Sequence, residues 1–195
     1  MKFSVRRIWQ YTLIVAMLVL VIGIAIDKRD VRHYADRMER LMADGDYEGA
    51  LHVGERSDKT DRRLMLLRID ALGHLHQLGD RLFTYPLTGH SGSLAQRGGD
   101  YALCACLIDK QLDRFVHLLP KYYPSTENLP HHYREALVLY NHLRANPALV
   151  YYDDVMDTDY RDLKQLERQY SDRRARQMAV FQQYEKTYWY YFGYK

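Results

Sequence analysis

Residues 31–51, VRHYADRMERLMADGDYEGAL, decide the fold of this chain. Apolar residues recur here at the three- and four-residue spacing of one helix face: Val31, Tyr34, Ala35, Met38, Leu41 and Met42. Charged residues fill the opposite face of the same stretch. Residues 44–46 (DGD) then turn the chain, and a second amphipathic stretch begins at Tyr47. The pattern predicts two helices in a hairpin.

The same periodicity continues along the chain and predicts about seven helices. A second hairpin starts at Thr60 or Asp61, either of which is a suitable N-cap, and its first helix ends at Gly79. Residues 84–100 are rich in Gly and Ser and are expected to be a surface loop. The helices that follow are expected at 101–119, 129–145, 157–170 and 172–184, the first of them opening on an uncharged run. This order predicts an all-α fold of antiparallel hairpins, an α-solenoid-like array.

The first hairpin resembles a tetratricopeptide repeat. Gly45, Tyr47 and Ala50 follow that repeat's order of a turn glycine, an aromatic residue and a small residue. Gly45 and Gly79 lie 34 residues apart, which is the period of this repeat. In the second copy the aromatic and small positions do not match, so the resemblance implies one good copy and one degenerate copy.

Residues 8–26 form a run of 19 residues without a charge. A helix of about 20 apolar residues crosses the hydrocarbon core of a bilayer, so we expect a retained transmembrane anchor. Two alternatives stay open: a signal peptide cleaved near residues 23–25 (GIA), and a buried core helix. Lys2, Arg6 and Arg7 favour a cytoplasmic N-terminus, whereas Lys28, Arg29 and Arg32 favour the opposite orientation with an equal count. The short N-terminal tail favours the first orientation, in which the body is extracytoplasmic.

Composition and charge exclude several classes of protein. The net charge is +3, and the three basic residues before residue 27 account for all of it, since they leave 25 basic residues against 25 acidic ones. A neutral body is a poor match for a phosphate backbone, so we expect no nucleic-acid partner. The chain has no phosphate-binding glycine loop and no zinc-protease or serine-hydrolase motif, and we expect neither a cofactor nor catalysis.

Three strings resemble an uncharacterised family of bacterial inner-membrane proteins: DRLFTYP (80–86), LPHHYREAL (129–137) and TYWYYF (187–192). The three strings together identify the family specifically, whereas each string alone is weak evidence. The resemblance implies a membrane region followed by a tetratricopeptide-like helical domain, and it covers most of residues 8–195. Members of that family are longer and carry several spans, so this chain matches only the last span and the C-terminal domain. The resemblance implies no activity and no functional residue.

Three groups of reactive side chains are each explained by structure. None of the nine histidines forms an obvious metal pair, so surface or packing roles are expected. Cys104 and Cys106 lie two residues apart, where a disulfide has unfavourable geometry, and are expected to be buried. The aspartates of residues 153–162 do not fit a calcium loop and are expected to cap a helix.

The string TYWYYFGYK (187–195) holds the strongest interaction signal. One interpretation packs these rings on the helical body. The other leaves them exposed, with Trp189, Tyr190 and Tyr191 touching a partner or the membrane.

We therefore expect a cytoplasmic tail (1–7), a transmembrane helix (8–26), a tetratricopeptide-like domain (27–186) and an aromatic tail (187–195). The expected function is a single-pass inner-membrane scaffold that binds membrane lipid through residues 8–26 and another protein through its body. One alternative is an enzyme or enzyme subunit acting on envelope glycans or lipids through Asp153, Asp154 or Asp157. Another is the C-terminal part of a larger multi-span protein.

Overall fold

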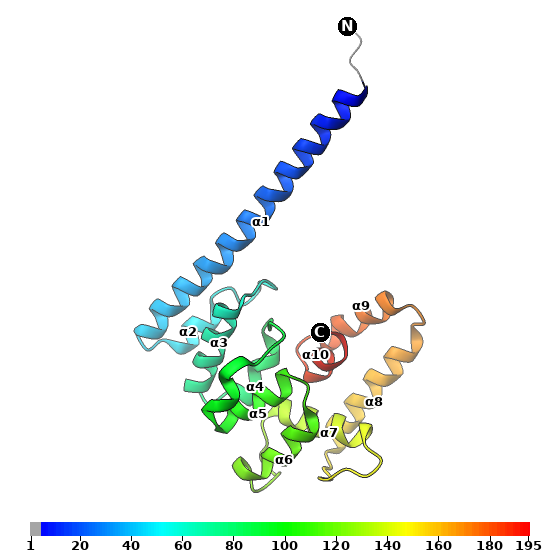
Figure 1. The fold of residues 1–195 in the computed structure, drawn as a ribbon. Coiled ribbons are helices and arrows are strands. Elements are labelled where there is room, and N and C mark those ends of the chain that lie inside the picture. Colours follow the sequence, from blue (N-terminus) through cyan, green and yellow to red (C-terminus); the bar gives the residue numbers. More distant parts are fainter. Residues whose placement is uncertain (1–4) are drawn as a thin grey trace.

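The computed structural model describes the backbone of residues 5–195 and the side chains of residues 11, 13–17 and 30–195. Every regular element in this part of the chain is helical, which confirms the all-α prediction (Figure 1). In chain order the elements are α1 (Val5–Ala43), α2 (Tyr47–His52), α3 (Arg62–His74), α4 (Leu78–Arg81), the 3-10 helices η1 (Leu82–Thr84) and η2 (Gly92–Arg97), α5 (Gly99–Ile108), α6 (Leu112–Tyr122), α7 (His131–Leu143), α8 (Asp154–Gln169), α9 (Arg173–Tyr184) and α10 (Tyr188–Tyr194).

Helix α1 extends away from the helical body, and only its last part packs against it (Figure 1). Val31, Ala35 and Met38 are buried against α2 and α3, as the spacing of residues 31–51 predicts. Among the described residues, no helix combines the length and the apolar character needed to cross a bilayer. Most side chains of the predicted span, residues 8–26, lie outside the described residues.

Helices α1, α3 and α5 end in the same kind of turn. Gly45, His76 and Lys110 each adopt a left-handed conformation, with φ of 80°, 57° and 57°. In each turn the next residue donates its backbone N–H to a carbonyl five residues back, at 2.8–2.9 Å, which closes the helix end. The first two predicted hairpins are therefore present, but His76, and not Gly79, corresponds to Gly45. The single helix predicted over 101–119 is wrong, because the left-handed turn at Lys110 divides it into α5 and α6. The helices that follow these turns have 6, 4 and 11 residues.

The main core is built around α5, on which residues 102–108 are all buried. Helices α4 and α6 and the 3-10 helix η2 pack around it. Helix η2 lies inside the range predicted as a loop, and its Leu94 is buried in the main core. Gly79 lets α4 cross α7 closely, because a Cβ atom there would lie 2.6 Å from Pro130 and 2.9 Å from Tyr133.

Helices α8 and α9 form a hairpin beside α7, and α10 packs against α9 and α7 (Figure 1). Asp153, Asp172 and Thr187 cap α8, α9 and α10 with their side chains. Helix α8 thus begins at residue 154, earlier than the start predicted at residues 157–159. The acidic residues before and in its first turn face the positive end of the helix dipole, as expected for capping.

Candidate functional site around Glu135

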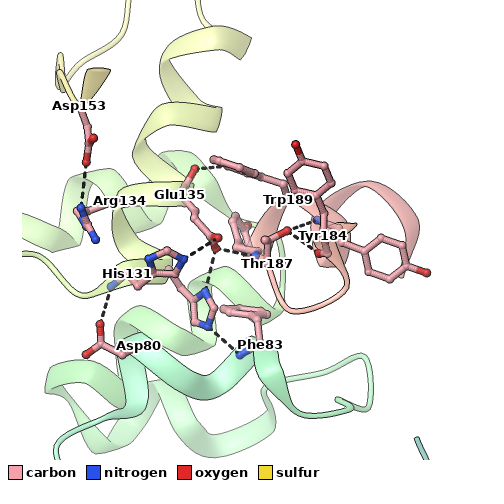
Figure 2. Close-up of polar contacts among 12 residues, drawn as sticks. Asp80, Phe83, His131, Arg134, Glu135, Asp153, Tyr184, Thr187 and Trp189 are labelled. Atoms are coloured by element: carbon pink, nitrogen blue, oxygen red, sulfur yellow. Dashed lines mark hydrogen bonds and ion pairs between the residues drawn. The ribbon is translucent and has the colours of Figure 1, made fainter. Parts of the chain in front are cut away.

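Glu135 is a buried carboxylate in the middle of α7, and its side chain is 1% exposed. Figure 2 shows polar groups from α7 itself and from α10 converging on it. His131 Nε2 lies 3.1 Å from Oε1, and His132 Nδ1 lies 2.9 Å from Oε2. The backbone N–H of Tyr188 donates to Oε2 at 2.7 Å, and Trp189 Nε1 donates to the backbone carbonyl of Glu135 at 2.8 Å. We call these five residues the Glu135 cluster.

The start of α7 is held by the segment that contains α4 and η1. Pro130 offers α7 no side-chain cap. The carboxylate of Asp80 instead accepts the backbone N–H of His131 at 2.6 Å. Phe83 donates its backbone N–H to His132 Nε2 at 3.3 Å, and its ring meets the His132 ring edge-on. Both histidines are thereby held by contacts outside α10.

The contact with Phe83 determines the tautomer of His132. Nε2 accepts a hydrogen bond, so it carries the lone pair, and Nδ1 of a neutral ring then carries the proton. That proton is donated to Glu135, which explains how a carboxylate is stabilised inside the core.

The electrostatics of the cluster favour an ionised Glu135. Burial alone raises the pKa of Glu135, but the hydrogen bonds from His131 and His132 outweigh it, and the pKa lies below its usual value. The hydrogen bond to Glu135 raises the pKa of His131, whose side chain is 48% exposed. The pair is therefore a charged contact at the edge of the core.

His131, His132 and Glu135 have ligand atoms within 4.8 Å of one another, which is the donor set of a possible metal site. The hydrogen bonds argue for a different role. A protonated Nδ1 cannot ligate a metal, and the Oε2 atom of Glu135 already accepts from Tyr188. The geometry fits a structural junction that joins α7, the α4–η1 segment and α10.

The rings of α10 are buried, in contrast to the interpretation that left them exposed. Trp189, Tyr190 and Tyr191 are each less than 10% exposed, and Tyr191 donates its hydroxyl to the carbonyl of Ile108 at 2.8 Å. Contact between these rings and a partner or a membrane stays a prediction, and α10 would have to leave its place to make it.

The aspartates proposed for the enzyme alternative lie at the start of α8. Asp153 caps the helix and also binds Arg134 at 3.1 Å. Asp157 pairs with His142 and Arg161, and Asp154 is exposed.

Cys104 and Cys106 are free and buried, as expected. Burial raises the pKa of both thiols, which keeps them protonated and unreactive.

Sequence reasoning missed Glu135. Its signal was present in HHYRE (131–135), because residues three and four apart share a helix face and Glu135 is placed to meet both histidines. The histidines were compared with one another, and not with the carboxylate that follows them.

Two hollows open on the surface of the body and share Leu87 and Lys195 as walls. The larger, about 820 Å³, lies between the base of α1, residues 58–61 and residues 86–88. The other, about 700 Å³, lies between residues 89–92 and residues 108–111. We call this pair of hollows the Leu87 groove. Its wall at residues 86–92 is fixed by Thr88, which binds Met65, and by Ser91, whose hydroxyl donates to Asp109 at 2.7 Å.

Residues 98–195 match the model of a family described as a family of unknown function (DUF6057). The match runs from the start of α5 to the end of the chain and contains the whole Glu135 cluster. It confirms the expectation of an uncharacterised family. No curated protein and no solved structure matches the chain.

Proposed function

The chain belongs to the DUF6057 family of unknown function, and from this premise we propose that it is a membrane-anchored helical scaffold that binds another protein. In this proposal its hairpins form a tetratricopeptide-like array with no catalytic role. The observation that carries the proposal is the contrast between two parts of the molecule. The reactive groups of the Glu135 cluster are engaged in internal hydrogen bonds, whereas the Leu87 groove is open.

The anchor is supported by residues 8–26. Helix α1 runs unbroken through them, and 19 helical residues extend about 28 Å, close to the thickness of a hydrocarbon core. Leu13, Ile14 and Met17 are more than half exposed. In the proposal this segment lies in the inner membrane, with the N-terminus in the cytoplasm and the body outside it.

The chemistry of the Leu87 groove favours an extended segment of a partner protein. Its walls combine apolar side chains, Val31, Pro86 and Leu87, with charges of both signs. Such a mixture suits a peptide with alternating apolar and charged side chains better than a nucleic acid or a uniformly charged ligand. The two hollows share walls, so a strand-like peptide can follow them from α1 to α5.

Photo-crosslinking in intact membranes tests this function. We expect a photoreactive residue at Leu87 to yield a defined adduct with one protein, and the same residue at Tyr152, 87% exposed and outside the groove, to yield none. The purified partner should then bind the full chain, and Leu87→Asp should weaken that binding about tenfold or more, because a charge replaces a buried apolar contact.

Two results would contradict the proposal. One is an identical set of adducts from positions 87 and 152. The other is unchanged binding of the purified partner by Leu87→Asp.

A further inference from the structure

Helix α9 is the least buried of the longer helices in the body. Val180 is its one buried residue. Met178 is 67% exposed and Phe181 is 44% exposed. Arg174, Met178 and Phe181 follow a spacing of four and three residues, so they lie on one face of the helix. This face presents a cation at its start and two large apolar side chains after it.

Two arginines at the start of α9 are unpaired. Within the described residues Arg173 and Arg174 have no hydrogen bond or ion pair, whereas the exposed arginines 63, 144 and 161 each pair with a carboxylate. The neighbouring Arg176 is used internally, since it donates to the carbonyl of Tyr170 at 2.9 Å. Free guanidinium groups beside exposed Met and Phe side chains are typical of helices that lie on an anionic bilayer surface.

The position of α9 agrees with this chemistry. In Figure 1, α9 lies on the side of the body toward which α1 extends, and the start of α8 points the opposite way. A membrane that holds residues 8–26 therefore faces α9.

We propose that α9 rests on the surface of the membrane that holds α1, with Met178 and Phe181 among the outer acyl carbons and Arg173 and Arg174 on the phosphates of anionic lipids. This inference rests on the proposed anchor. The second contact fixes the orientation of the body relative to the bilayer, and with it the direction in which the Leu87 groove opens.

The test uses the full chain in vesicles of phosphatidylcholine with about one third phosphatidylglycerol. A fluorophore is attached to Met178→Cys, and in a matched control to Val155→Cys, which is 74% exposed at the start of α8. The two native thiols are buried, so labelling is confined to the new cysteine. We expect nitroxide-labelled lipids to quench the label at 178, and aqueous iodide to quench the label at 155.

Charge variants test the role of the arginines. Arg173→Glu with Arg174→Glu should reduce lipid quenching at position 178 to the level of the control site. The same charge change on α6, Arg114→Glu with Lys121→Glu, should leave it unchanged, because α6 lies on the side away from α1 (Figure 1). In vesicles of phosphatidylcholine alone, quenching at 178 should also fall.

The outcomes separate this inference from the anchor. If the chain floats with the vesicles but position 178 is as open to iodide as position 155, the contact of α9 is overturned and the anchor stands. If the chain does not float, both fail. Lipid quenching that survives the charge reversal on α9 would overturn the role of Arg173 and Arg174.

Discussion

His76 holds a backbone conformation that a side chain disfavours. Its φ of 57° lies in the left-handed region, and its exposed ring forms no hydrogen bond among the described residues. We expect His76→Gly to raise the free energy of unfolding by about 1 kcal/mol, because glycine has no Cβ to strain this turn. Urea unfolding in a mild detergent measures the change. Gly45→Ala, at the corresponding turn after α1, should lower stability by a similar amount, and equal midpoints for all three proteins would contradict this account.

Glu135 supplies the acceptor for three donors in the core. In Glu135→Gln an amide N–H replaces one acceptor oxygen, and at least one buried donor loses its partner. We expect a loss of about 2–4 kcal/mol in unfolding free energy. A red shift of Trp189 fluorescence in a Trp9→Phe background should accompany it, since α10 loosens. A loss under about 0.5 kcal/mol would mean that the cluster is not a structural junction.

The charged pair of His131 and Glu135 predicts how stability depends on pH. The pKa of His131 is raised above 6.5 in the folded chain, so its contribution is complete below pH 6.5 and is lost as pH rises through the raised pKa. The pKa of Glu135 is lowered below 4.5, so its contribution is complete above pH 4.5 and is lost as pH falls through the lowered pKa. We therefore expect the cluster to stabilise most between pH 4.5 and 6.5.

His131→Gln is the matched control for this prediction. It keeps a donor near Glu135 but cannot titrate, so the alkaline loss of stability should disappear while the acid loss remains. Unfolding free energies measured from about pH 2 to pH 9 test both limbs. If the loss of stability at alkaline pH persisted in the variant, it would belong to a titrating group other than His131.

At the scale of the helix, two of the three buried tyrosines of α10 have opposite hydroxyl environments. The hydroxyl of Tyr188 is buried with no partner among the described residues, whereas that of Tyr191 donates to Ile108. We expect Tyr188→Phe to raise stability by about 1 kcal/mol, because it removes an unsatisfied polar group, and Tyr191→Phe to lower it by about 1 kcal/mol. Urea unfolding compares the two variants, and equal effects of the same sign would contradict the packing of α10.

The helices could be predicted from sequence where one face of the chain repeats at helical spacing. Val31, Ala35 and Met38 are such a face, and Tyr133, Ala136 and Tyr140 on α7 are another. The turn at His76 could not be predicted, because glycine normally occupies the left-handed position of such a turn. Gly79 lies three residues further on, but it allows the close approach of α4 and α7 and does not form the turn. Local spacing identifies elements well and their turn residues less well.

The candidate site was harder to predict than the helices. Its parts lie 53 residues apart between Glu135 and Tyr188, and 49 apart between Phe83 and His132. Residue spacing within one helix cannot show that a distant aromatic segment hydrogen-bonds to Glu135 in the core. The aromatic string indicates only that these rings are buried against something. The surface that buries them is set by the tertiary structure.

At the scale of the whole molecule, the reactivity of the two cysteines measures how often the helical core unfolds. Both lie on the buried helix α5, and their thiols are held protonated by burial. We expect a thiol reagent to modify the folded chain at least about 10³-fold more slowly than the chain in urea, because reaction requires unfolding of the core. Glu135→Gln should accelerate the reaction. A fast reaction of the native chain would show that α5 is accessible.

The burial of α10 also has a consequence for biosynthesis. The hydroxyl of Tyr191 binds a carbonyl 83 residues earlier in the chain, and residues 188–191 cover the main core. A ribosome that has translated α5, α6 and α7 has therefore made a core that cannot yet close. Its apolar faces stay open to chaperones until residues 188–194 reach the compartment in which the body folds, so the core closes last, and not helix by helix as the chain emerges.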